Sequence, residues 1–405
     1  MSALPWSRPD PLSAWHDPRH LQLRDCPLCG SARSRPVMTL EDFQFFSDAA
    51  IGKRVPVREV RCLDCQTLYL NPCWSSAGFA ALFAEAGCSY GASAGRAEEQ
   101  VDWLRARGLL DAGLSVLDAG CYDGRFLSRL PATLDRLGVD IDAPAIERGR
   151  ARDAQLTLLH GDFENFDCPR APDVITLFHV LEHLPRPLTV LRHLHALAKP
   201  TTRLVLEVPV LEHAATNDIN GFFSVQHMTH FSHASLAHAL ARGGWRLLER
   251  QTMDGYNGCR VLAEPAPVSE QVHADADDAA RLHDYLGAWH AAIAAVERRL
   301  LAARDWPRLV LWGAGLHSEF LWQLTSLFDR AEREVLLVDS DALKQGRRWR
   351  GLPILPPALL AEVDWSAAGL VISSYAGQPA IAAAAAELGV PAARCLSLYA
   401  SLRRY

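Results

Sequence analysis

The sequence lacks the features that would place it among membrane, secreted or nucleic-acid-binding proteins. No uninterrupted apolar run approaches the roughly 20 residues that a membrane-spanning helix needs. The opening segment, MSALPWSRPDPLSAW, has no basic stretch followed by an apolar core, so we expect no secretory signal. The formal net charge of −6 argues against a nucleic-acid partner, because such a partner requires a basic face. We therefore expect a cytoplasmic protein with neither a membrane nor a nucleic-acid partner.

Cysteine is too sparse for a disulfide scaffold, with ten residues in a chain of 405. Four of the cysteines form two C-x-x-C pairs, CPLC and CLDC. A C-x-x-C turn lets two thiolates reach one ion, and two such turns complete a tetrahedral site with no open position. A redox role for one pair is less favoured, because no βαβ pattern surrounds either pair. The sequence thus predicts a structural zinc ion bound by Cys26, Cys29, Cys62 and Cys65.

The length of the chain exceeds what one compact domain normally holds. Hydrophobic residues make up 49% and charged residues 22%, which is typical of a globular protein. We predict an α/β protein with a zinc-binding module at 1–74, a central domain at 75–265, a linker with a long helix at 266–304, and a smaller Rossmann-like α/β domain at 305–405.

The central domain shows alternating strand and helix patterns from about residue 100. The stretch SVLDAGCYDGRFLSRL predicts a buried strand, a turn flanked by Gly120 and Gly124, and then a helix. The next strand, LGVDID, ends in Asp140, at the distance along the chain where a carboxylate can bind two ribose hydroxyls. A third strand, in LTLLHGDFENF, has Asp162 at its tip. The pattern predicts a site for a nucleotide-like cofactor.

Four motifs of the central domain have the order and spacing found in a known family: the glycine-rich turn, GVD, GD and HVLEHL. In these motifs the chain resembles the class I S-adenosylmethionine-dependent methyltransferases over residues 75–265. The resemblance implies a Rossmann-like seven-stranded sheet with S-adenosylmethionine as cofactor. It places the methionine part at the 118–124 turn, the ribose at Asp140, and the adenine at Asp162 and Phe163. The full set of cofactor-binding residues that it implies is Tyr90, Ser93, Asp118, Gly120, Gly124, Asp140, Ile141, Asp162, Phe163 and His179.

The whole layout resembles a narrower family, the zinc-containing C-methyltransferases that act on nucleotide-linked keto-deoxysugars. The stretches HVLEHLP and SVQHMTHFS match its two active-site segments. The resemblance implies that His227 is the general base, with His183 across the site. His230 lies in the same loop beyond the fifth strand, where it is either a helper of His227 or a structural neighbour. The substrate would be a glycosyl or nucleotide-linked small molecule. Ser224 and Gln226 stand where the family has tyrosine and glutamate, which leaves O- or N-methylation open as an alternative to C-methylation.

Three other interpretations compete with this one. The stretch from His179 to His183 matches the H-x-x-E-H pattern of some zinc peptidases, but the prolines that follow would interrupt a ligand-bearing helix. A metal site made by the histidines of segment 227–238 has no nearby carboxylate pattern to support it. A non-catalytic scaffold is disfavoured by the intact turn and by the acids Asp140 and Asp162.

The last hundred residues repeat the strand, glycine-rich turn and helix pattern. Gly313 and Gly315 form the turn, and Asp339 ends the next strand. This pattern predicts either a site for a sugar nucleotide or another phosphate-bearing ligand, or a scaffold that only packs against the central domain. The sequence does not choose between the two.

Overall fold

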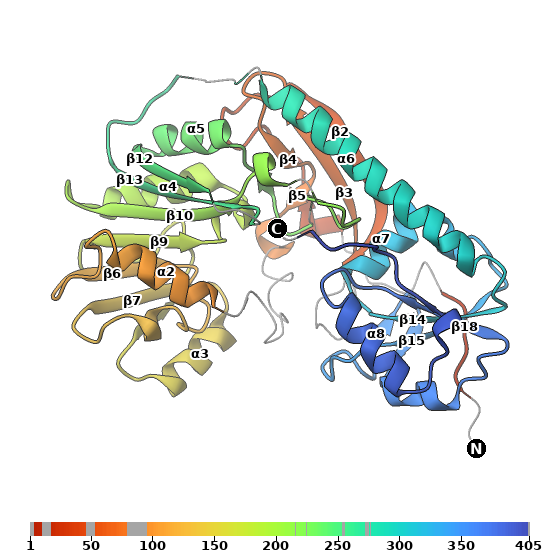
Figure 1. Cartoon of the computed structure of the whole chain (residues 1–405). Coiled ribbons are helices and arrows are strands. Elements are labelled where there is room, and N and C mark those ends of the chain that lie inside the picture. Colours follow the sequence, from red (N-terminus) through yellow and green to blue (C-terminus); the bar gives the residue numbers. More distant parts are fainter. Residues whose placement is uncertain are drawn as a thin grey trace.

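A computed structural model describes residues 4–9, 18–45, 53–78, 95–214, 216–223, 225–252, 256–271, 275 and 277–403. Tyr90, Ser93 and Ser224, which the sequence analysis singled out, lie outside the described residues. Two sheet-containing bodies are bridged by one long helix, α6, and by a β-hairpin (Figure 1). None of the helices in the described ranges has both the length and the apolar character needed to cross a membrane.

The central domain is built on a seven-stranded sheet with the order β12-β13-β10-β9-β6-β7-β8. Only β13 runs antiparallel to the others, where it pairs with β10 on one side and β12 on the other. The sequence prediction of an α/β fold with seven strands is confirmed. The strands are β6 (Ser115–Ala119), β7 (Asp135–Asp140), β8 (Thr157–His160), β9 (Val174–Phe178), β10 (Arg203–Pro209), β12 (Trp245–Thr252) and β13 (Gly258–Pro265).

Helices cover both faces of this sheet because each helix has one apolar stripe. Val101 and Leu104 of helix α2 pack with Ile146 of α3 in one core cluster. Leu191 of α4 and Leu240 of α5 belong to another cluster. The helices are α2 (Arg96–Arg105), α3 (Ala143–Arg152), α4 (Pro187–Leu197) and α5 (His233–Gly243).

The prediction of a helix directly after the first glycine-rich turn is wrong. The chain forms only bends and a short 3-10 turn, Leu127–Arg129, before the next strand. Gly124 adopts a φ of +75°, which no helical residue can have, and Pro131 follows a few residues later. Too few residues remain between them for a stable α-helix.

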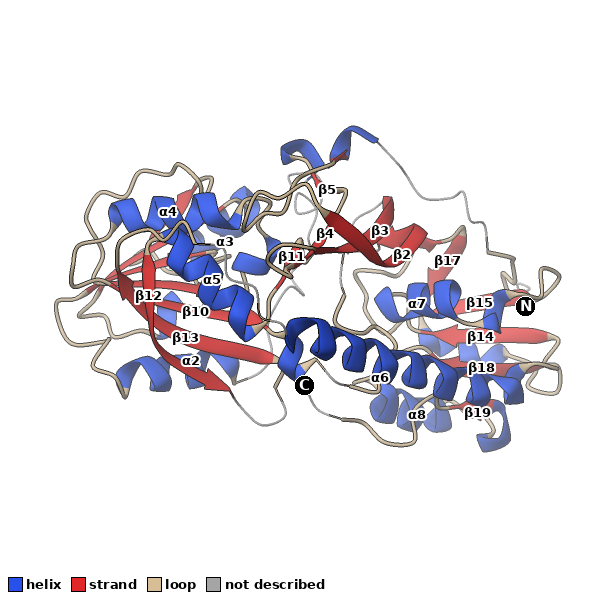
Figure 2. Ribbon diagram, turned by 90° about the horizontal axis from the view of Figure 1, so that it is seen from above, coloured by secondary structure: helices blue, strands red, loops and turns tan. Residues whose placement is uncertain are grey.

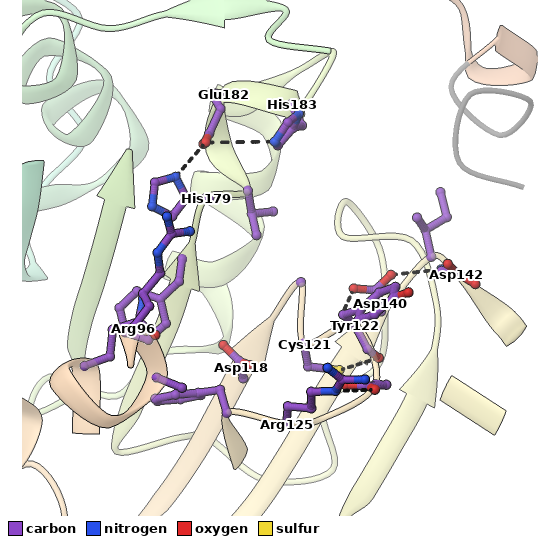
Figure 3. A pocket seen from close by; sticks show the side chains of 18 of the residues that line it. Arg96, Asp118, Cys121, Tyr122, Arg125, Asp140, Asp142, His179, Glu182 and His183 are labelled. Atoms are coloured by element: carbon purple, nitrogen blue, oxygen red, sulfur yellow. Dashed lines mark hydrogen bonds and ion pairs between the residues drawn. The ribbon is translucent and has the colours of Figure 1, made fainter. Parts of the chain in front are cut away.

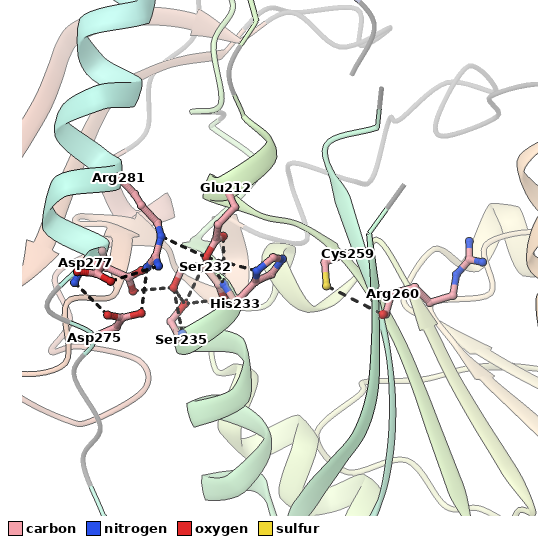
Figure 4. Close-up of polar contacts among 10 residues, drawn as sticks. Glu212, Ser232, His233, Ser235, Cys259, Arg260, Asp275, Asp277 and Arg281 are labelled. Atoms are coloured by element: carbon pink, nitrogen blue, oxygen red, sulfur yellow. Dashed lines mark hydrogen bonds and ion pairs between the residues drawn. The ribbon is translucent and has the colours of Figure 1, made fainter. Parts of the chain in front are cut away.

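Ser232 caps the N-terminus of helix α5. Its hydroxyl accepts a hydrogen bond from the Ser235 backbone N–H, and the two serines form a reciprocal capping box. Ser232 also donates to Asp278 at 2.6 Å, and Arg281 pairs with that carboxylate at 2.8 Å (Figure 4). Since Asp278 and Arg281 belong to α6 (Asp277–Leu300), these contacts tie the long helix to the beginning of α5.

The N-terminal module shares a sheet with the central domain. Strand β11 (Thr229–His230) pairs with β4 (Leu68–Leu70). The same sheet then contains β3 (Lys53–Cys62) beside β4, and β2 (Ser34–Phe45) at its edge. A second, two-stranded sheet joins β1 (Leu21–Gln22) to β5 (Cys73–Trp74). The segment that carries His227 is therefore connected directly to the cysteine-bearing module.

The C-terminal sheet has the order β16-β17-β15-β14-β18-β19. All of its strands except β16 run parallel to one another. Helix α6, which lies within the predicted range 266–304, runs beside this sheet (Figure 2). One apolar cluster joins the β2–β3 hairpin, α6 and the inner strands. The remaining elements are β14 (Arg308–Trp312), β15 (Glu334–Val338), β16 (Arg348–Trp349), β17 (Leu352–Leu355), β18 (Ala368–Ile372), β19 (Cys395–Leu396), α7 (Leu316–Leu324) and α8 (Gln378–Glu387).

Candidate functional site

A cavity of about 540 Å³ opens where β6, β7 and β9 end (Figure 3). Ligands of open α/β sheets bind at this edge, beyond the carboxyl ends of the strands. Residues predicted from the sequence to form the site make up much of the wall. Those that line the cavity are Asp118, Gly120, Asp140, Ile141, Phe163, His179, His183 and His227.

The glycine-rich turn brings the backbone to the cavity wall at Gly120. This residue has a φ of +90°, and a Cβ atom there would lie 2.2 Å from a methyl group of Val180. Only glycine fits such a position without displacing β9 and its following loop. Gly124, in contrast, does not line the cavity, and its missing Cβ leaves space for Leu156 and Leu158 behind the turn.

Two buried acids lie under this turn. Asp140 accepts hydrogen bonds from the backbone N–H groups of Tyr122 at 2.7 Å and Asp142 at 2.9 Å. Burial raises the pKa of Asp140. Burial also raises the pKa of Asp118 to about 7, and the nearby charge of Asp140 adds to the increase, while a hydrogen bond from Thr176 opposes it. Asp140 thus holds the turn in place while its carboxylate borders the cavity.

Of the two residues predicted to contact adenine, the structure places only one at the cavity. Phe163 lines the cavity, whereas Asp162 is exposed and does not. The Asp162 carboxylate accepts the backbone N–H of Glu164 at 3.0 Å, which caps a local turn. A capping role therefore accounts for the carboxylate without a ligand.

A polar network that the sequence analysis missed adjoins the cavity through His179. Glu207, buried on β10, accepts hydrogen bonds from Tyr256 at 2.6 Å and from Arg260 at 2.8 Å, and lies 3.1 Å from His179 Nε2. Burial lowers the pKa of His179, but the neighbouring carboxylates Glu182 and Glu207 outweigh it and raise the pKa to about 9. The signal was present, because glutamate and arginine interrupt the otherwise apolar strands LVLEVPV and CRVLAEP.

Two histidines close the opposite end of the cavity. The rings of His183 and His227 lie 4.8 Å apart between centroids. His183 Nδ1 lies 2.9 Å from the backbone carbonyl of Gln226, so this nitrogen must be the donor. Burial lowers the pKa of His183 and moves that of His227 well below its usual value, so both rings are neutral at neutral pH. Glu182, also missed, lies between His179 and His183 (Figure 3).

His230 is not brought to the cavity. Its Nε2 lies 2.8 Å from Glu59 Oε1, and both side chains are buried at the junction of β11 with the N-terminal module. The ring centroid is 6.1 Å from that of His227. This position suits a residue that anchors the His227 segment rather than one that contacts a ligand.

The four predicted zinc ligands converge. Their sulfur atoms lie within 4.8 Å of one another, with Cys26 to Cys65 and Cys29 to Cys62 each at 3.5 Å. A tetrahedral zinc site with bonds of about 2.3 Å places its sulfurs ~3.8 Å apart. The geometry therefore fits the predicted structural zinc.

Arg24, two residues before the first of these cysteines, connects the module to both histidine segments. Its guanidinium donates to the backbone carbonyls of Pro185, at 2.6 Å, and Met228. These carbonyls follow His183 and His227 closely in the chain. The cysteine module thus fixes the two segments relative to each other.

The glycine-rich turn of the C-terminal domain has a structural explanation. A Cβ atom on Gly313 would lie 2.3 Å from the backbone oxygen of Ser373, so close packing of β14 and β18 requires the glycine. Asp339 accepts the backbone N–H of Ala314 at 2.7 Å and pairs with Lys344 at 3.4 Å. These contacts favour the scaffold interpretation over a second ligand site.

Comparison with known proteins assigns the central part of the chain. Residues 95–250 match the family model described as a methyltransferase domain. The mitochondrial ubiquinone biosynthesis O-methyltransferase of Schizosaccharomyces pombe is 33% identical over 105 residues, covering 24% of this chain. The matched part spans only 38% of that relative's own length.

Solved methyltransferase structures also align with the chain. The magnesium protoporphyrin IX methyltransferase of Synechocystis PCC 6803 with bound S-adenosylmethionine is 21% identical, covers 42% of this chain and 78% of its own, and has a TM-score of 0.33. The CcbJ methyltransferase of Streptomyces caelestis is 14% identical, with 47% and 96% coverage and a TM-score of 0.36. The family match and the strand order together show that residues 95–250 have the fold of a class I S-adenosylmethionine-dependent methyltransferase domain.

Proposed function

We propose that this protein is an S-adenosylmethionine-dependent methyltransferase that acts on a sugar or nucleotide-linked sugar. The observation that carries the proposal is a cavity that has a glycine turn and a buried carboxylate at one end and the imidazoles of His183 and His227 at the other. One end suits a nucleoside cofactor and the other suits an acceptor that must lose a proton. We also propose that the domain boundaries lie at residues 74, 265 and 304.

The cavity fits the cofactor in size and chemistry. Its volume of about 540 Å³ is within the usual range for small-molecule sites. Asp140 would bind the ribose hydroxyls, Asp118 and the Gly120 backbone would hold the methionine part, and Phe163 would contact the adenine. S-adenosylmethionine, when bound, supplies a methyl group on a positively charged sulfur.

Methyl transfer depends first on alignment of the acceptor with that methyl group. The acceptor atom forms a bond to the methyl carbon, the sulfur–carbon bond breaks, and the proton of the acceptor must leave. His183 and His227 stand where that proton would be lost. A neutral imidazole has a lone pair that can take a proton or bind a cation that acidifies the acceptor.

The sugar substrate rests on the three-part layout and on the matches to the keto-deoxysugar C-methyltransferases. O-methylation is the second candidate, favoured by one observation. Gln226 lines the cavity in place of an acid and uses its backbone carbonyl to orient His183, so no carboxylate supports His227 from that position. The partial relative named above is itself an O-methyltransferase.

Replacing Asp140 by alanine is expected to weaken the binding of S-adenosylmethionine and S-adenosylhomocysteine roughly 10- to 100-fold. The lost interactions are hydrogen bonds to a charged group, each worth about 1.5–3 kcal/mol. Titration calorimetry measures both affinities. Asp162→Ala is the matched control, because that carboxylate is exposed outside the cavity and should change affinity little. Equal affinities for wild type and Asp140→Ala would contradict the ribose assignment, and binding of NAD instead would overturn the class.

His227→Asn is expected to lower turnover roughly 10²–10⁴-fold while the cofactor affinity stays unchanged. The substitution keeps a similar side-chain size but removes the basic imidazole nitrogen. The assay would supply a panel of nucleotide-linked keto-deoxysugars with labelled S-adenosylmethionine, and His160→Asn, an exposed histidine on β8, is the control. Exchange of a substrate carbon-bound hydrogen in heavy water indicates C-methylation, whereas turnover without exchange indicates O- or N-methylation.

A further inference from the structure

We infer that Glu182, His183 and His227 form a binding site for one divalent cation at the acceptor end of the cavity, separate from the four-cysteine site. One potential ligand atom from each residue lies within 4.8 Å of the others. Two imidazoles and one carboxylate are a ligand set that binds zinc, manganese, iron or cobalt. The ligands come from two segments that Arg24 holds together.

The orientation of His183 supports the site. Because Nδ1 donates its hydrogen to the Gln226 carbonyl, Nε2 of the neutral ring carries a lone pair. Nε2 lies 3.9 Å from Glu182 Oε1. Histidine ligands of metals commonly donate their second ring nitrogen to a backbone carbonyl in this way.

Glu182 provides a second, independent observation. The residue is only 1% exposed, yet within the described part of the chain neither carboxylate oxygen makes a hydrogen bond of normal geometry, and Oε1 has a loose ion-pair contact with His179 Nδ1 at 3.4 Å. Leaving such a group unsatisfied is costly, which is why buried carboxylates usually have strong partners. A bound cation would satisfy it.

His179 fits the role of an outer-shell partner to this carboxylate. Its Nδ1 lies 3.4 Å from Glu182 Oε1, while its Nε2 faces Glu207 and Tyr256. His179 is not one of the residues whose ligand atoms cluster here, so the H-x-x-E-H pattern is not used as in peptidases. His227, distant in sequence, takes the place of the first histidine.

The cation would determine which acceptors the protein uses, and this role rests on the proposed function. Three protein ligands leave at least one coordination position open, and His183, His227 and Glu182 all line the cavity. An acceptor oxygen could occupy that position. The cation would lower the pKa of a hydroxyl, whose proton passes to solvent, or polarise a carbonyl next to the methylated atom. The substrate class is therefore an acceptor with an oxygen at, or adjacent to, the methylated position.

The test is a cobalt titration of the full chain with its cysteine-bound metal retained. We expect one equivalent of Co²⁺ to bind with visible d–d bands and without thiolate charge-transfer absorption. Glu182→Gln and His227→Asn should each weaken this binding by at least about 100-fold, since even outer-shell losses cost 10–100-fold. His160→Asn should bind Co²⁺ as the wild type does.

Calorimetry with S-adenosylmethionine on the same samples separates the two proposals. Retained cofactor binding in both variants shows that they fold, so their loss of cobalt affinity supports the site. The inference is overturned if no cobalt binds, if binding brings thiolate bands, or if the variants bind cobalt as tightly as the wild type. Cofactor binding without any cobalt binding would refute the cation site alone, whereas failure of the wild type to bind the cofactor would refute the proposed function.

Discussion

Replacing Cys62 by serine is expected to abolish binding of the predicted zinc ion and to unfold the N-terminal sheet while the seven-stranded sheet stays folded. Cys62 ends β3 and is fully buried beside Leu28 and Tyr69. Structural zinc sites contribute about 10–16 kcal/mol of apparent binding free energy, which is available only to the folded ligand set. Elemental analysis would report the zinc content, and hydrogen exchange would report protection of β2, β3 and β4.

The loss of structure should extend to the segments that carry His183 and His227 and no further. Met228 donates its backbone N–H to the Glu182 carbonyl at 2.7 Å and accepts from Leu70 at 3.1 Å and from Arg24. Exchange should therefore also increase over residues 225–231, and cobalt affinity should decrease, while S-adenosylmethionine still binds.

Cys168→Ser is the matched control, because this cysteine is half-buried in the central domain, apart from both cysteine pairs. It should leave zinc content and exchange unchanged. Full protection of β2–β4 in a zinc-free Cys62→Ser protein would show that the module needs no metal.

The features predicted correctly from the sequence are those determined by neighbouring residues. The turn at Gly120, the acid at the end of β7 and the two cysteine pairs each depend on a few residues in succession. Their conformational preferences are strong enough to be recognised without tertiary information.

The parts that could not be predicted depend on residues that are distant in the chain. Glu182 meets His227 only through the tertiary fold, and Glu207 meets Arg260 because the two residues are paired across the antiparallel strands β10 and β13. The helix predicted after Gly124 failed for a related reason. The sequence pattern of strand, turn and helix does not reveal that the turn geometry and a proline leave too few residues for the helix. Asp162 stands where the sequence predicts an adenine contact, but in the structure it is exposed, caps a local turn and does not line the cavity.

Arg350→Met is expected to destabilise the protein by about 3–5 kcal/mol, although the residue is far from the cavity. Arg350 and Glu319 are both fully buried, and their side chains form a two-point ion pair, with Nε at 3.0 Å from Oε2. Removing one partner leaves an uncompensated charge in the interior. The pair also joins two parts of the chain, because Glu319 accepts the backbone N–H of Gln44 at 2.9 Å and Arg350 donates to the carbonyl of Asp42 at 2.8 Å.

Urea unfolding measures this effect, and a double variant separates the charge from the packing. Glu319→Leu combined with Arg350→Met should recover much of the lost stability, because apolar side chains can replace a buried ion pair at little cost. The exposed pair of Arg105 and Asp102 provides the control, and Arg105→Met should cost no more than about 1 kcal/mol. If Arg350→Met were as stable as the wild type, the β2–β3 hairpin would not depend on this pair for its attachment to the C-terminal domain. The expected loss, with cofactor affinity unchanged, would support the view that this domain is a scaffold that holds the N-terminal module, and through it the His227 segment, in place.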